Sequence, residues 1–304
     1  MVPANLISVV DLHLSLGGMP ILRGINLAIE QGDVLGIVGE SAMGKSTLGR
    51  CLVGLERPSS GSVRFLGDDV HAKRFRTSPG RRALQFLFQD PTSALDPKAT
   101  VERTLREALG AAEGQVACST AAIEALLADV GLDAKYVRRF PHQLSVGERQ
   151  RLCLARVLAL RPRVVVADEP TSALDVIVKT EIAQQLRMLA DREITLVLIS
   201  HDLPMVRRLC SAVVVLFAGR VVECGSVEEV LESPAHPYTR ALLAVESSAD
   251  SSAISASGCA FRPRCRRYAA HHDRRCEDEL PDLLELSDDH RIACHQDDSG
   301  AAPR

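Results

Sequence analysis

The fold of this chain is decided by Gly39-Glu40-Ser41-Ala42-Met43-Gly44-Lys45-Ser46-Thr47, which fits the phosphate-loop pattern G-x-x-x-x-G-K-[ST]. The apolar run Val34–Val38 before it predicts a buried strand, and Leu48–Val53 after it predicts a helix. In this context, backbone N–H groups and the helix N-terminus favour a bound phosphate. We expect a nucleotide site in which Lys45 reaches the β- and γ-phosphates and Ser46 holds Mg²⁺. The alternative is a glycine-containing turn before an ordinary helix, and the lysine and hydroxyl in register argue against it.

Length and composition are those of a globular protein. The 304 residues suffice for one large domain and an appendage, with 46% apolar and 25% charged residues. The net charge of −3 gives no overall basic field, so we expect no nucleic-acid partner. The longest apolar run, around Val213–Ala218, is too short to span a bilayer. Any membrane connection is therefore expected to run through a partner.

Strand-like and helix-like segments alternate along the chain, which predicts a mainly parallel α/β core. Ahead of the phosphate loop, Ile7–Leu16 and Ile21–Ala28 predict an edge β-region of strands joined at Gly17-Gly18. Helical spacing predicts a mostly helical subdomain over about 91–160. Within it, Ser145 and Glu148 form a capping box that opens a helix.

Two acidic residues follow a buried strand, Val164–Ala167. Such a strand fixes its C-terminal carboxylate beside the phosphate loop, where open α/β sheets bind ligands. We expect Asp168 to reach Mg²⁺ through water, and Glu169 to polarise the water that attacks the γ-phosphate. The alternative, an acidic pair that caps a surface strand, is disfavoured by the phosphate loop upstream.

With these motifs the chain resembles an ABC transporter ATP-binding subunit, an ABC ATPase, over residues 1–246. In that family a glutamine after the third core strand senses the γ-phosphate and Mg²⁺, and Gln89 in Phe88-Gln89-Asp90-Pro91 matches it. A switch histidine that contacts the γ-phosphate is matched by His201. The resemblance therefore implies ATP hydrolysis, with Lys45, Gln89, Glu169 and His201 as the residues that carry it.

Two further motifs of the family act across a dimer interface. Leu144-Ser145-Val146-Gly147-Glu148 resembles the signature Leu-Ser-Gly-Gly-Gln, and Ser172-Ala173-Leu174-Asp175 matches the loop that crosses the interface. The resemblance implies that Ser145, Gly147 and Asp175 complete the nucleotide site of a second ATPase subunit. It also implies two transmembrane permease subunits and an extracytoplasmic solute-binding protein, with this chain peripheral at the cytoplasmic face of the inner or plasma membrane.

Three positions depart from the family pattern. An adenine-stacking aromatic should fall near Leu16, yet no Phe, Tyr or Trp precedes Phe65, so we expect either loose adenine selectivity or packing by aliphatic side chains. The pair Ala42-Met43 replaces the usual small residues of the loop, and Ala42 is expected at ordinary φ/ψ despite its Cβ. Val146 replaces a signature glycine, which predicts slower hydrolysis at the site that this signature completes. The same valine favours a sibling ATPase over a second copy as the dimer partner.

The tail narrows the subfamily. A Ser-rich stretch over 247–258 predicts a linker, 259–295 form a cysteine-rich motif, and 296–304 are expected to be a disordered tail. The run His236-Pro237-Tyr238-Thr239-Arg240-Ala241-Leu242-Leu243 and the cysteine motif resemble ATPases of the oligopeptide/dipeptide/nickel importer group. The motif's four cysteines have the spacing C-x5-C-x10-C-x17-C and are Cys259, Cys265, Cys276 and Cys294.

Four thiolates can hold either a [4Fe–4S] cluster or Zn²⁺. The spacing matches neither a compact ferredoxin run nor a two-CxxC zinc pattern, so the residues alone leave iron–sulfur, zinc and unliganded cysteines open. The resemblance favours the cluster, in a structural role.

These observations predict the energy-coupling ATPase of an importer for oligopeptides, dipeptides or a related small solute such as nickel. The alternative is a soluble ABC-type regulatory ATPase linked to ribosomes, DNA or a metal, without transport. Ribosome- or DNA-linked relatives usually carry two linked cassettes or a long coiled-coil insertion, and the sequence has neither. A switch that only binds nucleotide would not need Glu169 and His201.

Overall fold

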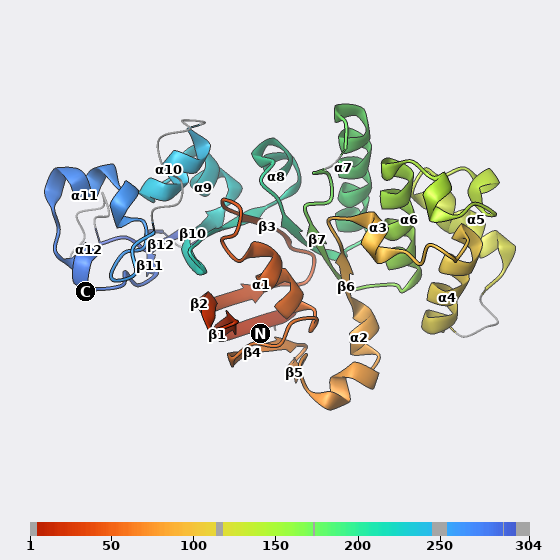
Figure 1. Cartoon of the computed structure of the whole chain (residues 1–304), viewed down its shortest axis with the longest axis horizontal. Helices are drawn as coiled ribbons and strands as arrows, with labels where there is room; N and C mark the ends of the chain where they lie inside the picture. The colour runs from red at the N-terminus through yellow and green to blue at the C-terminus, as the bar shows by residue number, and fades with distance from the viewer. Residues whose placement is uncertain (1–4, 114–117, 173, 245–253, 288, 296–304) are drawn as a thin grey trace.

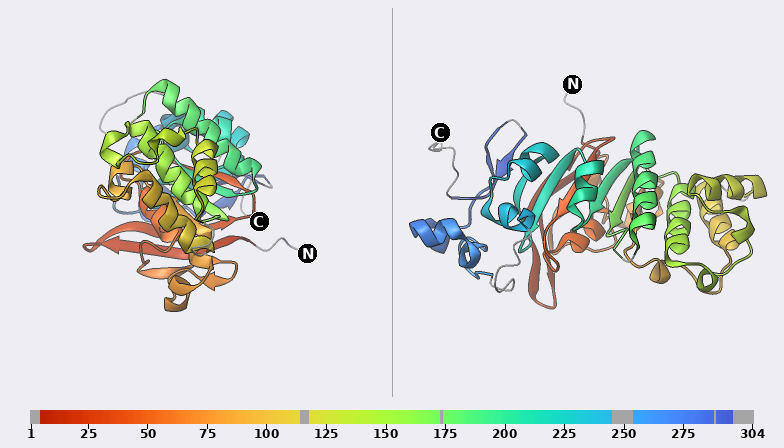
Figure 2. Two further views of the ribbon diagram at one scale, coloured as in Figure 1. Left: turned by 90° about the vertical axis from the view of Figure 1, so that its right-hand side faces the viewer. Right: turned by 90° about the horizontal axis from the view of Figure 1, so that it is seen from above.

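A computed structural model of the chain describes residues 5–113, 118–172, 174–244, 254–287 and 289–295. The predicted linker over 247–258 lies mostly outside these residues, and the predicted tail over 296–304 lies wholly outside them. The molecule is elongated, with an α/β core at its centre, helices α4 to α6 at one end and the C-terminal extension, residues 254–295, at the other (Figures 1 and 2).

The core is a sheet whose described strands run in the order β11-β12-β10-β9-β3-β8-β7-β6. The strands from β9 to β6 in that order pair in parallel, whereas β10, β12 and β11 pair antiparallel. The prediction of a mainly parallel α/β core is therefore confirmed. The bounds are β3 (Val34–Val38), β6 (Leu84–Leu87), β7 (Val164–Asp168), β8 (Thr195–Ile199), β9 (Ala212–Phe217), β10 (Arg220–Ser226), β11 (Leu284–Glu285) and β12 (Arg291–Ile292).

The central strands are buried on both faces, and successive side chains enter different hydrophobic layers. On β3, Leu35 and Ile37 pack with α1 and the antiparallel sheet, whereas Val34 and Val38 pack with the helices on the opposite face. This explains why the parallel strands are continuous apolar runs without alternation. All five residues of β3 are buried.

The predicted antiparallel β-region is confirmed, but it forms a separate sheet and does not extend the edge of the core. Its described strands run in the order β2-β1-β4-β5, and together with α1 (Lys45–Leu52) it covers one face of the core sheet (Figure 1). The strand bounds are β1 (Ile7–Leu16), β2 (Met19–Ile29), β4 (Ser60–Phe65) and β5 (Asp68–Asp69).

Helices cover the remaining surfaces. Three short ones are α2 (Gly80–Ala83), α3 (Pro91–Ala94) and α9 (Val227–Glu232), and α11 (Arg266–His271) and α12 (Arg275–Asp278) lie in the extension. None of the helices in the described residues is both long and apolar enough to cross a membrane. The longer elements are α4 (Val101–Glu113), α5 (Thr120–Asp129), α6 (Val146–Ala159), α7 (Val176–Asp191), α8 (Leu203–Leu209) and α10 (Pro237–Leu243).

The extension is joined to the core by strand pairing and by one buried carboxylate. Strand β12 pairs with β10, so the core sheet continues into the extension. Glu223 on β10 is fully buried and accepts hydrogen bonds from the backbone N–H groups of Ala235 and His236. Its Oε1 also lies 2.8 Å from Nε2 of His290 in the extension. Because a buried carboxylate needs such partners, these contacts tie the two parts together.

Candidate functional site

The phosphate loop turns between β3 and α1, as the strand–loop–helix pattern predicts. Gly39 has a φ of 147°, and a Cβ there would lie 2.3 Å from the carbonyl oxygen of Leu216. Only glycine fits this close approach of loop and β9. Lys45 is 8% exposed, and its Nζ donates to the carbonyl oxygens of Gly39 and Glu40, each at 2.7 Å. The ammonium therefore lies within the curve of the loop.

Ala42 differs from the expectation of ordinary backbone angles. Its φ is 64°, in the left-handed region, where the Cβ of an L-residue approaches the following carbonyl oxygen. A strained conformation of this kind persists only where the surrounding fold holds it.

We expect Ala42→Gly to raise the free energy of unfolding by about 0.5–1 kcal/mol, because relief of the left-handed strain exceeds the added chain entropy of glycine. Urea unfolding of the purified chain measures it. Ala125→Gly is the matched control, since Ala125 is exposed within α5. That change should lower stability by about 1 kcal/mol. If both substitutions lower the free energy of unfolding, Ala42 is not strained in the way inferred here.

Ser46 and Asp168 lie together at the carboxyl end of the sheet. The Ser46 hydroxyl donates to Oδ1 of Asp168 at 2.8 Å, and Asp168 is 2% exposed. Burial raises the pKa of the Asp168 carboxyl, while the Ser46 hydrogen bond and Arg50 oppose that rise. Hydroxyl and carboxylate oxygens are the ligands that Mg²⁺ prefers, so this pair fits the predicted metal position.

Burial lowers the pKa of the neighbouring Lys45 ammonium, against the opposing charges of Glu169, Asp168 and Glu40. The candidate site thus sets one buried cation among three carboxylates. A bound triphosphate with its metal would add charge of both signs to this group.

Glu169 and His201 face each other from the ends of adjacent strands. The Nδ1 of His201 lies 2.8 Å from Oε1 of Glu169. Glu169 has a φ of 45°, and its N–H donates to the carbonyl oxygen of Ile199. This bend separates the direction of Glu169 from that of Asp168, the residue before it. A left-handed glutamate beside a buried aspartate is the kind of backbone strain that gathers at active sites.

Gln89 is exposed after β6, and its Nε2 lies 3.4 Å from Oγ of Ser172. The structure thus brings Gln89 to the loop that follows Glu169. It does not show a hydrogen bond from Gln89 to Ser46 or to Asp168.

The three residues expected to act across a dimer lie at the starts of α6 and α7. Ser145 caps α6 and forms the predicted capping box with Glu148, whose N–H donates to the Ser145 hydroxyl. Asp175 caps α7 and accepts from the N–H groups of Ile177 and Val178. The two helix starts touch, since a Cβ on Gly147 would lie 2.7 Å from Val178.

An apolar surface surrounds these helix starts. Val176 and Ile177 are 79% and 74% exposed, and Val146 is 38% exposed. Neighbouring, strongly exposed apolar side chains of this kind are typical of a surface that contacts another molecule.

The four cysteines of the tail line one small cavity, together with His236 and His295. Burial raises the pKa of the Cys276 thiol to about 12, and the other three cysteines add to the rise. Even so, the described residues contain no group of three or more His, Cys, Asp or Glu side chains placed to hold a metal ion. Zinc needs four ligands within about 2.3 Å of one ion, whereas a cubane cluster binds each thiolate at a different iron.

Several residues that meet the loop or its surroundings were not predicted from the sequence. Tyr238 and Arg264 contact Glu40 of the phosphate loop from the C-terminal part of the chain. In the sequence, only the run around Tyr238 attracted attention, and it indicated the importer group and not a contact with the phosphate loop. Leu16 and Met19 are 48% and 67% exposed on the hairpin of β1 and β2.

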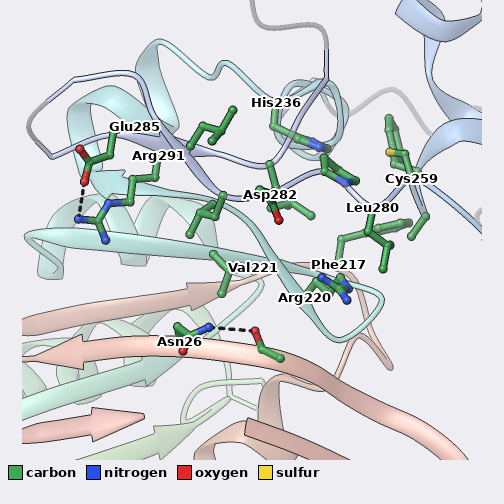
Figure 3. Close-up of a pocket in the computed structure, with 18 residues that line it drawn as sticks. Asn26, Phe217, Arg220, Val221, His236, Cys259, Leu280, Asp282, Glu285 and Arg291 are labelled. Atoms are coloured by element: carbon green, nitrogen blue, oxygen red, sulfur yellow. Dashed lines mark hydrogen bonds and ion pairs between the residues drawn. The ribbon is translucent and has the colours of Figure 1, made fainter. Parts of the chain in front are cut away.

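A cavity of about 680 Å³ is lined by residues of β2, β10 and the extension (Figure 3). Glu285 is ion-paired with Arg291, whereas Arg220 lies near both Arg23 and Asp282 and its buried Nε has no hydrogen-bond partner among the described residues. The cavity is a seam between core and extension.

Comparison with known proteins extends the match beyond these motifs. Residues 22–172 match the family described as ABC transporter, and residues 222–271 match the C-terminal region of the oligopeptide/dipeptide transporter family. A Brucella abortus protein named "Putative peptide import ATP-binding protein" is 38% identical over 303 residues, which cover 93% of this chain and 89% of that protein. A protein of the same name from Brucella ovis is 38% identical, with 92% of each chain covered.

Two solved structures resemble the fold. The first is cbiO1 of Clostridium perfringens, part of the ABC transporter complex cbiONQ, with a TM-score of 0.67, 29% identity, and 75% of this chain and 91% of that chain covered. The second is a dimeric post-hydrolysis state of the ATP-binding cassette MJ0796 bound to ADP and Pi, with a TM-score of 0.64, 27% identity, and 73% and 98% covered. This chain belongs to the ABC transporter family, as an ATPase with the C-terminal region of its oligopeptide/dipeptide transporters.

Proposed function

We propose that this chain is the energy-coupling ATPase of an importer for peptides, peripheral at the cytoplasmic face of the membrane. The observation that carries this is the likeness over 93% of the chain to proteins named for peptide import, with the C-terminal region included. Its partners are two permease subunits, an extracytoplasmic solute-binding protein and a second ATPase subunit. The runner-up, a regulatory ATPase without transport, would leave the C-terminal match unexplained.

The proposed chemistry uses the residues of the candidate site. Lys45 and the loop N–H groups bind the phosphates of ATP, and Ser46, with Asp168 and Gln89, holds the Mg²⁺ that neutralises phosphate charge. Glu169 orients the attacking water, and His201 positions Glu169 and contacts the γ-phosphate. The 2.8 Å contact between His201 and Glu169 supports this pairing.

Reconstitution tests the transport function. The chain is assembled in vesicles with the permease and ATPase subunits that co-purify with it, and a peptide-loaded binding protein is added. We expect peptide uptake to require ATP, and ATPase activity to rise when the peptide-loaded binding protein is present. ATPase activity that ignores this protein, in a complex that moves no peptide or nickel, would favour the regulatory alternative.

The proposed dimer partner is a sibling ATPase. Ser145, Gly147 and Asp175 act on the partner's nucleotide, and exposed Val176 and Ile177 supply apolar surface for the interface. Val146 stands beside that nucleotide, so the site it completes turns over slowly.

We expect Val146→Gly to raise the ATP turnover of the assembled complex by about two- to tenfold, because it restores backbone N–H access to the γ-phosphate. Steady-state phosphate release measures it. Glycine at this helical position costs about 1 kcal/mol of helix stability, so a faster enzyme would not reflect a more stable one. Unchanged turnover would show that Val146 does not limit the partner's site.

A [4Fe–4S] cluster is proposed for Cys259, Cys265, Cys276 and Cys294, with a structural role. The four cysteines line one small cavity, which supports a shared ligand, and the resemblance to the importer group favours the cluster over Zn²⁺. Anaerobically purified chain should contain about four iron and four sulfide per chain. Cys276→Ala should lose both, while Cys118→Ala, outside the motif, keeps them. Zinc without iron would refute the cluster.

A further inference from the structure

The C-terminal extension reaches the phosphate loop through one arginine. Arg264 ends the short 3₁₀ helix over 262–264, directly before Cys265. Its Nη1 and Nη2 donate to the two carboxylate oxygens of Glu40, at 2.9 and 2.6 Å. The guanidinium also lies over the rings of Phe217 and Phe261, 5.9 and 5.3 Å from their centroids. A planar fork that is paired and stacked in this way has little freedom to turn.

Glu40 is hydrogen-bonded through three of its own groups. Its N–H donates to the hydroxyl of Tyr238 at 2.8 Å, its carbonyl oxygen accepts from Lys45 at 2.7 Å, and its carboxylate accepts from Arg264. Tyr238 is fully buried on α10. The first turn of the phosphate loop is thus fixed from outside, by α10 and the extension.

Besides holding the loop in place, Arg264 neutralises the negative charge of Glu40. The Arg264 and Glu40 side chains are 14% and 26% exposed, so solvent screens this pair incompletely. Without the arginine, an unpaired carboxylate would remain in the loop that binds the triphosphate. Glu40 already acts on the ammonium of Lys45, which places its charge within reach of the phosphates. A negative carboxylate and a negative triphosphate repel each other.

We propose that Arg264 is a positioning residue for ATP, through which the cysteine-rich extension sets the nucleotide affinity of the phosphate loop. The arginine neutralises Glu40 and fixes the turn that Glu40 begins. It touches the loop and not the reacting atoms. The proposal rests on ATP binding by this chain and not on its cargo, so it stands or falls separately from peptide import.

Nucleotide affinity of the purified full-length chain tests it, read by titration with a fluorescent ATP analogue and Mg²⁺. We expect Arg264→Ala to raise the dissociation constant about tenfold, because the unpaired Glu40 carboxylate then repels the negatively charged triphosphate. In a Glu40→Gln background the same substitution should raise it less than about twofold, because no carboxylate is left unpaired. A purely structural role of Arg264 would not depend on the charge of residue 40.

Two variants make the result decisive. Arg262→Ala is the matched control, because Arg262 lies in the same 3₁₀ helix but stacks over Tyr268 at 5.8 Å, and it should leave the dissociation constant unchanged. Arg264→Lys keeps the positive charge but loses the planar guanidinium that binds both carboxylate oxygens, so we expect the dissociation constant to rise about threefold. Should Arg264→Ala not fold, Arg264→Lys is compared in both backgrounds. Equal rises in both backgrounds, or no rise in either, would overturn the proposal.

Discussion

Glu169→Gln is expected to lower ATP hydrolysis by about 10²- to 10³-fold while ATP still binds, because the amide cannot accept the proton of the attacking water. Glutamine keeps the size of the side chain and can still pair with His201, which lies 2.8 Å from the carboxylate. The contacts proposed for Lys45 with the phosphates and for Ser46 with Mg²⁺ do not involve this carboxylate. The measurement is phosphate release at saturating ATP, beside titration with a fluorescent ATP analogue.

Glu107→Gln is the control for Glu169→Gln, since the exposed Glu107 pairs with Arg103 on α4, away from the candidate site. It should hydrolyse ATP at nearly the rate of the unmodified chain. If the Glu169→Gln variant hydrolyses ATP within about threefold of the unmodified rate, a group other than Glu169 orients the attacking water.

Lys45→Ala is expected to weaken MgATP binding by at least about 10²-fold, since each charge-assisted hydrogen bond contributes about 1.5–3 kcal/mol. The ammonium is buried within the loop, so water cannot replace it easily. Removing it also leaves the carbonyl oxygens of Gly39 and Glu40 without their donor. Transport by the assembled complex should stop with it.

The matched control for Lys45→Ala is Lys135→Ala, because the Lys135 side chain is 62% exposed and pairs with Asp133. Its nucleotide affinity and thermal unfolding should match those of the unmodified chain. If Lys45→Ala unfolds the chain, Lys45→Met, which keeps the apolar stem, tests the same charge. Full transport with either Lys45 variant would remove the nucleotide site from the mechanism.

Local pattern predicted the elements of the fold. Strand β3 has the predicted bounds, because buried parallel strands are apolar throughout and loops and helices interrupt them. The box of Ser145 and Glu148 opens α6 as predicted, because a helix cap depends on residues three apart. Such features are fixed by neighbours in the chain.

Backbone strain could not be read from residue types. Ala42 and Glu169 both adopt a left-handed φ that their side chains disfavour. Their own preference is for ordinary angles, and packing of the loop and of β7 overrides it. Packing also decides that the antiparallel β-region forms a separate sheet. Which surfaces of this sheet, α1 and the core sheet pack together cannot be read from the strand pattern.

The sequence by itself determined that this chain carries a phosphate loop on an α/β core, because strand, loop and helix are consecutive. Only the tertiary structure decided what meets that loop. Ser46 and Asp168 lie 122 residues apart and Arg264 and Glu40 lie 224 apart, yet each pair is hydrogen-bonded. No local propensity encodes such pairs, since they follow from sheet order and from the return of the chain to β10. The link from the extension to the nucleotide loop therefore became visible only in the folded chain.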